Sequence, residues 1–246
     1  MKGIKVTIFA LCASMILCGC NGMTNMAKGG LIGSTAGGAA GTGIGALIGK
    51  LVGGKSGAKK GAAIGAAVGV AGGTTAGLLI GKKMDKAKAA AAALEAAQAE
   101  ALTDENGNTI GVRVTFDGGL LFASGKSALT ATAQNNLTQF AQNVVTSDMD
   151  LAIVGHTDND AWKGCTAAES TAKNQTLSED RASAVSKYLN GKGIASSQIK
   201  TVMGKGETTP VADNSTAAGK AQNRRVEVYI IPSEEMVAAA NAGTLK

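Results

Sequence analysis

Glycine recurs at every fourth position of this 246-residue chain from Gly29 to Gly81 without a break. Glycine in a helix interior costs about 1 kcal/mol relative to alanine, so this spacing disfavours a water-exposed helix. It is typical of helices whose backbones pack closely, as at the small-residue interfaces of helices in lipid. Every fourth residue advances about 40° around a helix, so the glycines would form one inclined groove. The register predicts close-packed, membrane-directed helices, and we call it the glycine zipper.

Two apolar stretches of the zipper, roughly 29–52 and 61–81, flank a polar bend at 53–60. Each stretch approaches the ~20 residues that cross a bilayer, and two crossings would return the chain to its starting side. The zipper is therefore predicted to form a membrane hairpin. Glycine and alanine contribute little transfer energy, so a homo-oligomer formed through the zipper is a further expectation.

The first residues have the pattern of a secretory signal, with Lys2 and Lys5 before an apolar stretch at 6–17. The following Leu-Cys-Gly-Cys resembles a bacterial lipobox, which predicts a signal peptide at 1–19 and a lipid on the thiol of Cys20. An ordinary signal peptide cut near Gly19 is the alternative. Asn21, by resemblance to enteric lipoprotein sorting, favours the outer membrane. Cys165 would then be the only other cysteine of the mature chain, which leaves no intrachain disulfide.

Charge divides the chain into two parts. Residues 28–88 carry nine lysines and one acid, whereas residues 89–246 carry 13 basic and 17 acidic side chains. The basic part suits anionic lipid head groups, so outer-membrane lipid is an expected partner. The mildly acidic distal part argues against nucleic acid as a partner.

Beyond the lipidated N-terminus and hairpin (20–83), the composition predicts three more regions. Alanine-rich residues 84–102 indicate an exposed helical stalk, and 104–108 a turn, so that 84–109 forms a linker. Residues 110–232 have the pattern of an α+β domain, and 233–246 that of a short tail. The domain is expected to contain strands at 112–116, 150–155, 199–203 and 225–231, a helix opening at Thr130, and a helix from an N-cap at Ser178 to Gly191.

Two charged residues of the domain are candidates for a site. Arg181 lies on or beside the apolar face of the helix expected after Ser178, where an unpaired charge would be costly. Asp158 follows the buried strand 150–155 closely enough to meet it. Spacing alone leaves two interpretations open. The pair is either a structural ion pair or a two-pronged site for a zwitterion, with Asp158 taking an ammonium and Arg181 a carboxylate.

Three ordered motifs resemble the signature of OmpA-like peptidoglycan-binding domains: His156-Thr157-Asp158, the run Asn174 to Val185, and the run Asn214 to Glu227. The resemblance covers about 110–232 and implies a β-α-β-α-β fold with an added closing strand. It further implies that Asp158 and Arg181 clasp diaminopimelate of a peptidoglycan stem peptide, in a pocket lined by Thr157, Asn174 and Leu177. Arg224 and Arg225 match the closing motif, and at least one is expected to be structural. A zipper between a lipobox and such a domain is similar to YiaD-type outer-membrane lipoproteins.

The segment between Asp158 and Asn174 is longer than the family pattern, and it contains Trp162, the only tryptophan. This insertion would reshape or cover the mouth of the pocket. His156 is the only histidine, so no histidine-based metal cluster can form, and no catalytic relay is apparent. We therefore expect no metal, no cofactor and no enzymatic activity. The chain is predicted to tether the outer membrane to peptidoglycan, with its C-terminal domain in the periplasm. The alternative is an oligomeric zipper pore or assembly protein anchored by wall binding.

Overall fold

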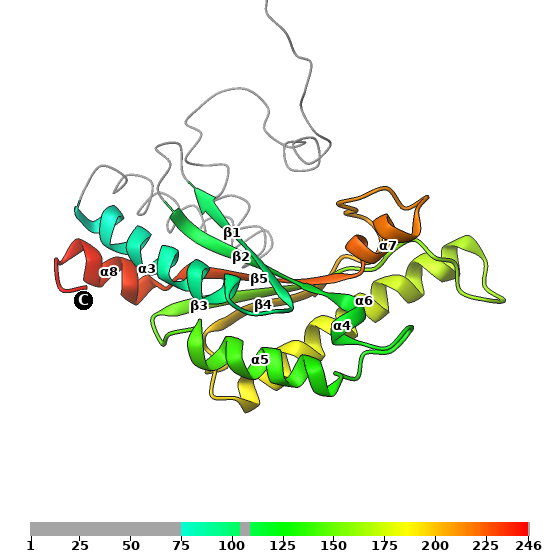
Figure 1. Ribbon diagram of the computed structural model, residues 1–246, viewed down its shortest axis with the longest axis horizontal. Coiled ribbons are helices and arrows are strands. Elements are labelled where there is room, and N and C mark those ends of the chain that lie inside the picture. Colours follow the sequence, from blue (N-terminus) through cyan, green and yellow to red (C-terminus); the bar gives the residue numbers. More distant parts are fainter. Residues whose placement is uncertain (1–74, 104–108, 246) are drawn as a thin grey trace, which may run out of the picture. The chain divides into compact units, whose positions relative to one another are not determined.

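A five-stranded mixed sheet organises the residues that the computed structural model describes, 75–103 and 109–245 (Figure 1). Helix α3 (Thr75–Ala92) precedes the hairpin of β1 (Ala97–Thr103) and β2 (Thr109–Asp117). The elements that follow are α4 (Gly118–Leu121), α5 (Ala131–Asn143), β3 (Met149–Gly155), α6 (Ala167–Gly191), β4 (Ile199–Gly204), α7 (Ala217–Asn223), β5 (Arg225–Pro232) and α8 (Glu234–Asn241).

The strands lie in the order β1-β2-β5-β3-β4, with β3 and β4 parallel and the other pairs antiparallel. The expected α+β fold and its four strands are confirmed in β2, β3, β4 and β5. The closing strand β5 is not an edge strand. It lies between β2 and β3, where Val228 pairs with Val114 on one side and with Ile153 on the other. All eight of its residues are buried, because it has neighbours on both sides.

One face of the sheet packs against α3, α5 and α6 in a single apolar core. Phe116 of β2 meets Phe140 of α5 edge to face, with ring centroids 5.5 Å apart. The helix expected at Thr130 is confirmed, since the Thr130 hydroxyl accepts a hydrogen bond from the Ala133 N–H at the start of α5. Strand pairing brings the ends of β2 and β3 together with the start of β5, through the pairs Asp117–Arg225 and Gly155–Val226.

The prediction of an exposed helical stalk at 84–102 is wrong. The helix ends at Ala92, and Ala97–Thr103 is a strand that pairs with β2. Pairing with the backbone of β2 overrides the helix propensity of this alanine-rich sequence. Helix α3 is also not exposed on all sides. A stripe of its residues is buried in the core: Ala76, Ile80, Met84, Ala87 and Ala91.

The last two glycines of the zipper register also lie on α3. Gly77 and Gly81 are buried in α3, beside its contact with β2. The end of the apolar stretch 61–81 thus belongs to a helix packed on the sheet. The signal peptide, Cys20 and the remainder of the hairpin lie outside the described residues. Within 75–103 and 109–245, no helix has the length and apolarity needed to span a membrane.

One further expectation, the N-cap at Ser178, needs correction. Ser178 does not cap a helix, because α6 begins 11 residues earlier, at Ala167. Thr166 is the N-cap and forms a capping box with Glu169, which lets the helix start within the insertion. The tail after residue 232 contains α8, which Ser233 caps and which packs against α3, with Met236 only 1% exposed.

Candidate functional site

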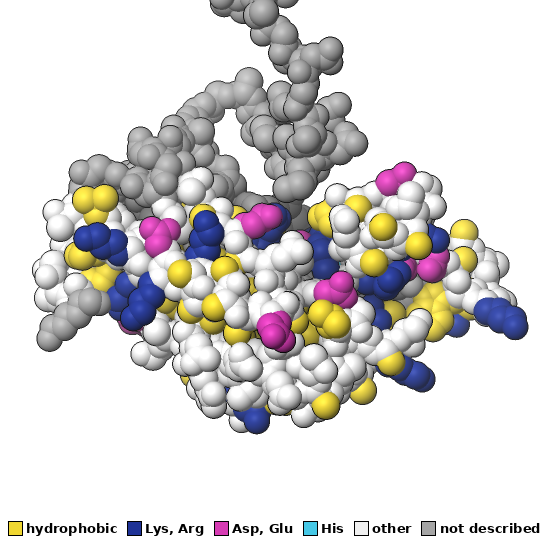
Figure 2. Space-filling view, in the orientation of Figure 1, with side chains coloured by type: hydrophobic (Ala, Val, Ile, Leu, Met, Phe, Trp, Pro, Cys, Tyr) yellow, Lys and Arg dark blue, Asp and Glu magenta, His cyan; other side chains and the backbone are white. Residues whose placement is uncertain are grey.

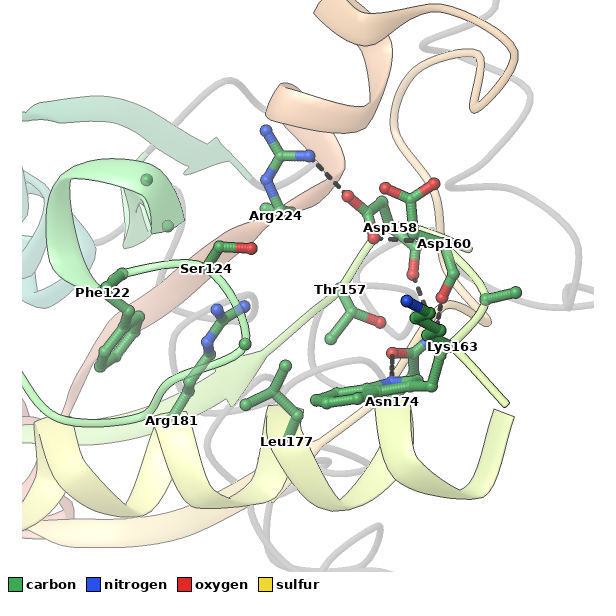
Figure 3. A pocket seen from close by; sticks show the side chains of 16 residues that line it. Phe122, Ser124, Thr157, Asp158, Asp160, Lys163, Asn174, Leu177, Arg181 and Arg224 are labelled. Atoms are coloured by element: carbon green, nitrogen blue, oxygen red, sulfur yellow. Dashed lines mark hydrogen bonds and ion pairs between the residues drawn. The ribbon is translucent and has the colours of Figure 1, made fainter. Parts of the chain in front are cut away.

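A cavity of about 570 Å³ opens beside α6, where β2 and β3 end and β5 begins (Figure 3). Its wall consists of the segment 118–125, the segment 157–163 after β3, one side of α6, and Arg224 before β5. All five predicted site residues line this cavity: Thr157, Asp158, Asn174, Leu177 and Arg181. The structure therefore brings together the five residues that were predicted to form the pocket.

A close approach of backbones positions the site. A Cβ atom added to Gly155, at the end of β3, would lie 2.1 Å from the carbonyl oxygen of Ser178 in α6. Only glycine lets the strand and helix come this near. The Ser178 hydroxyl donates to the Gln175 carbonyl (2.7 Å) and accepts from the Gly206 N–H (2.8 Å), so it fixes α6 to the loop after β4. Asp158 and Arg181 reach one cavity because of this contact.

Asp158 is buried and already paired within the protein. Its Oδ2 lies 2.5 Å from Nη1 of Arg224, and its Oδ1 accepts a hydrogen bond from the Asp160 N–H. The direct Asp158–Arg181 ion pair, one of the two interpretations above, is not the arrangement found. Arg224 takes that place; its match to the closing motif was predicted, but its position in the pocket was not.

Arg181 is 3% exposed and forms no ion pair with any carboxylate in the described part of the chain. Its Nε donates to the Lys126 carbonyl (3.0 Å), and its guanidinium lies 5.1 Å from the ring centre of Phe122. Burial lowers the pKa of Arg181, and the nearby charge of Asp158 partly offsets this effect. Figure 3 shows its side chain rising from α6 into the space that Thr157 and Asp158 border.

Two other predicted site residues differ in how their polar atoms are used. The Thr157 hydroxyl is buried and has no hydrogen-bond partner among residues 75–103 and 109–245. Asn174 is fully engaged, since its amide oxygen accepts from the Trp162 indole N–H (2.8 Å) and its amide nitrogen donates to Glu207 (2.8 Å). The Thr157 hydroxyl therefore stays without a partner among the described residues, whereas Asn174 holds the surrounding loops in place.

The two consecutive arginines of the closing motif have different roles. Arg225 is buried, donates to Glu227 at 2.8 Å and to the carbonyl oxygens of Thr209 and Asn223, and is structural. Arg224 lines the cavity and is more exposed. Successive side chains of a strand point to opposite faces, which explains why the two arginines have different roles. The motif alone does not say which of them faces the cavity.

Basic side chains are frequent around the mouth of the cavity. Lys163, Arg181 and Arg224 belong to its wall, and Figure 2 shows lysine and arginine side chains beside acidic ones on the side where α7 lies. Asp160 is neutralised by Lys220 at 2.6 Å, in the same way as Asp158 is by Arg224. The described residues contain no cluster of histidine, cysteine, aspartate or glutamate suited to a metal ion.

Comparison with known proteins shows similarity to one family of proteins. Residues 121–224 match the sequence model of the OmpA family. The chain is 37% identical over 116 residues to the outer-membrane lipoprotein YfiB of Pseudomonas aeruginosa, covering 47% of this chain and 63% of that protein. It is 36% identical over 121 residues to the lipoprotein YiaD of Escherichia coli, covering 48% of each. It is 40% identical over 83 residues to the peptidoglycan-binding protein ArfA of Mycobacterium bovis, covering 34% of this chain and 23% of that protein.

The matches thus span less than two thirds of the length of these relatives. Among solved structures, a MotB-like protein from Desulfovibrio vulgaris has the same fold, with a TM-score of 0.53 and 20% identity, covering 64% of this chain and 96% of that one. The cavity residues Phe122, Asp158, Arg181 and Arg224 all lie within the matched segment 121–224. Residues 121–224 therefore form an OmpA-like domain, with the lipoproteins YfiB and YiaD among its homologues.

Proposed function

We propose that this protein binds peptidoglycan non-covalently and tethers the outer membrane to the cell wall. The observation that carries the proposal is Arg181, a buried cation that lines the cavity without a carboxylate partner among the described residues. An unpaired buried charge is costly, and a ligand carboxylate would offset that cost. Arg181 is the anion-binding half of the site.

The cation-binding half is Asp158. Its carboxylate lies in the same cavity and would accept a ligand ammonium alongside Arg224. The cavity wall carries three cations, Lys163, Arg181 and Arg224, and two carboxylates, Asp158 and Asp160. Its net positive charge favours a ligand with at least one carboxylate. A zwitterionic end of diaminopimelate in a stem peptide has both required charges, and the Thr157 hydroxyl supplies a further hydrogen-bonding group.

The proposed role is binding rather than catalysis. Asp158 and Asp160 are the carboxylates of the cavity wall, and each is paired with a cation, which disfavours a role as general acid or base. The relatives support the same role, since YfiB is an outer-membrane lipoprotein and ArfA is a peptidoglycan-binding protein. We place the domain in the periplasm, with a lipid anchor on Cys20 in the outer membrane.

The test is a pull-down of purified protein with isolated sacculi. Asp158→Asn and Arg181→Ala should each lower the bound fraction at least tenfold, because each removes one charged contact in a desolvated site. Free meso-diaminopimelate should displace the wild-type protein. Asp180→Ala, which alters an exposed carboxylate beside Arg181, is the matched control and should bind normally.

Circular dichroism and thermal melts would establish that the variants remain folded. Undiminished sacculus binding by folded Asp158→Asn and Arg181→Ala proteins would refute the site. Wild-type protein that does not sediment with sacculi would refute the function itself.

A further inference from the structure

We propose that Trp162 determines ligand specificity by contacting the aliphatic chain that joins the zwitterionic end of the ligand to the rest of the molecule. The inference rests on the proposed function, because it concerns the same cavity. It assigns a role to the insertion after Asp158, in which Trp162 lies. The ligand class is an amino acid with a free ammonium and carboxylate on one carbon and a side chain of several methylene groups attached to that carbon.

The indole of Trp162 is held from several sides. The backbone N–H of Trp162 donates to the Ser170 hydroxyl (3.0 Å), and the indole N–H donates to the amide oxygen of Asn174 (2.8 Å). The Lys173 ammonium lies 5.6 Å from the ring centre, within the range of a cation–π contact. Ser170 and Asn174 are both at least 96% buried, so both hydrogen-bond partners of Trp162 are packed inside the domain. The ring is therefore a preformed part of the cavity wall.

The ring also reaches the opposite side of the cavity. A Cβ atom added to Gly125 would lie 3.7 Å from Cη2 of Trp162, so the indole spans from α6 to the segment 118–125. Gly125 has a φ of 65°, a conformation that other residues rarely adopt. Trp162 thus narrows the space next to Asp158 and faces a cavity that Leu177 also lines.

The charged and the apolar residues of the cavity would contact different parts of the ligand. Asp158 and Arg181 would bind the ammonium and carboxylate that every free amino acid carries, so they do not distinguish one amino acid from another. Trp162 and Leu177 offer apolar surface beside them. One methylene group in an apolar pocket changes affinity by roughly tenfold or more. A ligand with an aliphatic chain would be selected by this wall.

The experiment measures displacement of the full-length protein from sacculi by meso-diaminopimelate and by glycine, a zwitterion without a side chain. For the wild type, meso-diaminopimelate should be effective at a concentration at least about tenfold lower than glycine. Trp162→Ala should reduce this preference to about threefold or less while leaving the effect of glycine unchanged. Trp162→Phe, which retains an aromatic ring, should keep most of the preference. Leu78→Ala removes an exposed apolar side chain on α3 and is the control.

The proposed function and the role of Trp162 can be refuted separately. If neither amino acid displaces the wild type and Asp158→Asn still binds sacculi, the proposed function is wrong. If meso-diaminopimelate displaces the wild type but Trp162→Ala keeps the full preference, or loses the response to both amino acids equally, the assignment of Trp162 is wrong. Because Trp162 is the only tryptophan, its fluorescence gives a second readout, and emission unchanged by saturating meso-diaminopimelate would also contradict the contact.

Discussion

A buried polar network lies beside the cavity, on the sheet face opposite the helices. Glu227 accepts hydrogen bonds from Arg225 (2.8 Å) and from the Tyr229 hydroxyl (2.6 Å), and its Oε2 is 3.6 Å from Nε2 of His156. Nδ1 of His156 shares a hydrogen bond with the Thr209 hydroxyl at 2.9 Å. Burial lowers the pKa of His156 below its ordinary 6.5, because the charged imidazolium would be poorly solvated.

This network predicts that acid destabilises the domain in two steps. The folded state resists protonation of His156, so the unfolded state takes up more protons once the pH falls below about 6.5, and the free energy of unfolding decreases. Burial alone would raise the pKa of Glu227, but His156 and Arg225 hold it well below its ordinary 4.5, so more stability is lost below that pH. Urea unfolding at pH 7.5, 5.5 and 4, as rough settings, would measure both steps.

His156→Gln is the control for the first step, because the chain has no other histidine. In that variant the free energy of unfolding should change little between pH 7.5 and 5.5, which are about one unit either side of the ordinary pKa. An equal loss of stability in the variant and the wild type would assign the effect to other groups.

Single residues also show where sequence reasoning about the site succeeds and where it stops. Asp158 and Arg181 could be identified because their positions follow from a strand end and a helix face. The pairing of Asp158 with Arg224 could not, because it depends on a contact 66 residues apart in the chain. The role of Asn174 as a support for Trp162 depends likewise on how the insertion folds.

At the scale of elements, α3 and β1 extend the core beyond the boundary expected at residue 110. The Thr109 hydroxyl donates to Asp85 (2.6 Å), and Lys83 forms an ion pair with Asp148 (2.5 Å). Together with the buried stripe of α3, these contacts fix the helix along β1 and β2. The helix is a structural layer of the domain.

This packing predicts that Met84→Ala lowers the free energy of unfolding by about 2–5 kcal/mol, the usual cost of truncating a large apolar side chain in a core. Met84 is 0% exposed, and Leu78 of the same helix is 56% exposed. Leu78→Ala should therefore change stability by no more than about 0.5 kcal/mol. Urea unfolding of both variants decides the matter, since an exposed stalk would give similarly small effects for both.

The elements that sequence reasoning predicted well are those with a clear hydrophobic pattern. The alternating strand 112–116, the continuous apolar strand 150–155 and the periodic helix after Thr130 are examples. It failed for 97–103, where alanine, glutamine and glutamate favour a helix but the exposed edge of β2 is available for pairing. It failed again at the start of α6, because Ser178 has the composition of an N-cap while the true capping box lies within the insertion.

At the scale of the whole molecule, the proposal separates the anchor from the wall-binding domain. Cys20→Ala should release the protein from the membrane fraction, because the acyl chains provide the main apolar attachment in the proposed design. The same variant should still sediment with sacculi, because Asp158 and Arg181 are unchanged. Cell fractionation with a parallel pull-down would test both statements. Retention of Cys20→Ala in the membrane fraction after salt and urea washes would instead favour anchoring by the glycine zipper.

The placement of α3 relative to the cavity has a mechanical consequence. Asp158 follows the end of β3 at which Gly155 pairs with Val226, whereas Lys83 and Asp85 of α3 contact residues at the opposite ends of β3 and β2. A pull between the wall ligand and the start of α3 would therefore run along the strands. Hydrogen bonds between antiparallel strands are perpendicular to the strands, so this force would shear many of them at once rather than open them one after another. A tether built in this way would be loaded in the direction in which the strand hydrogen bonds resist force together.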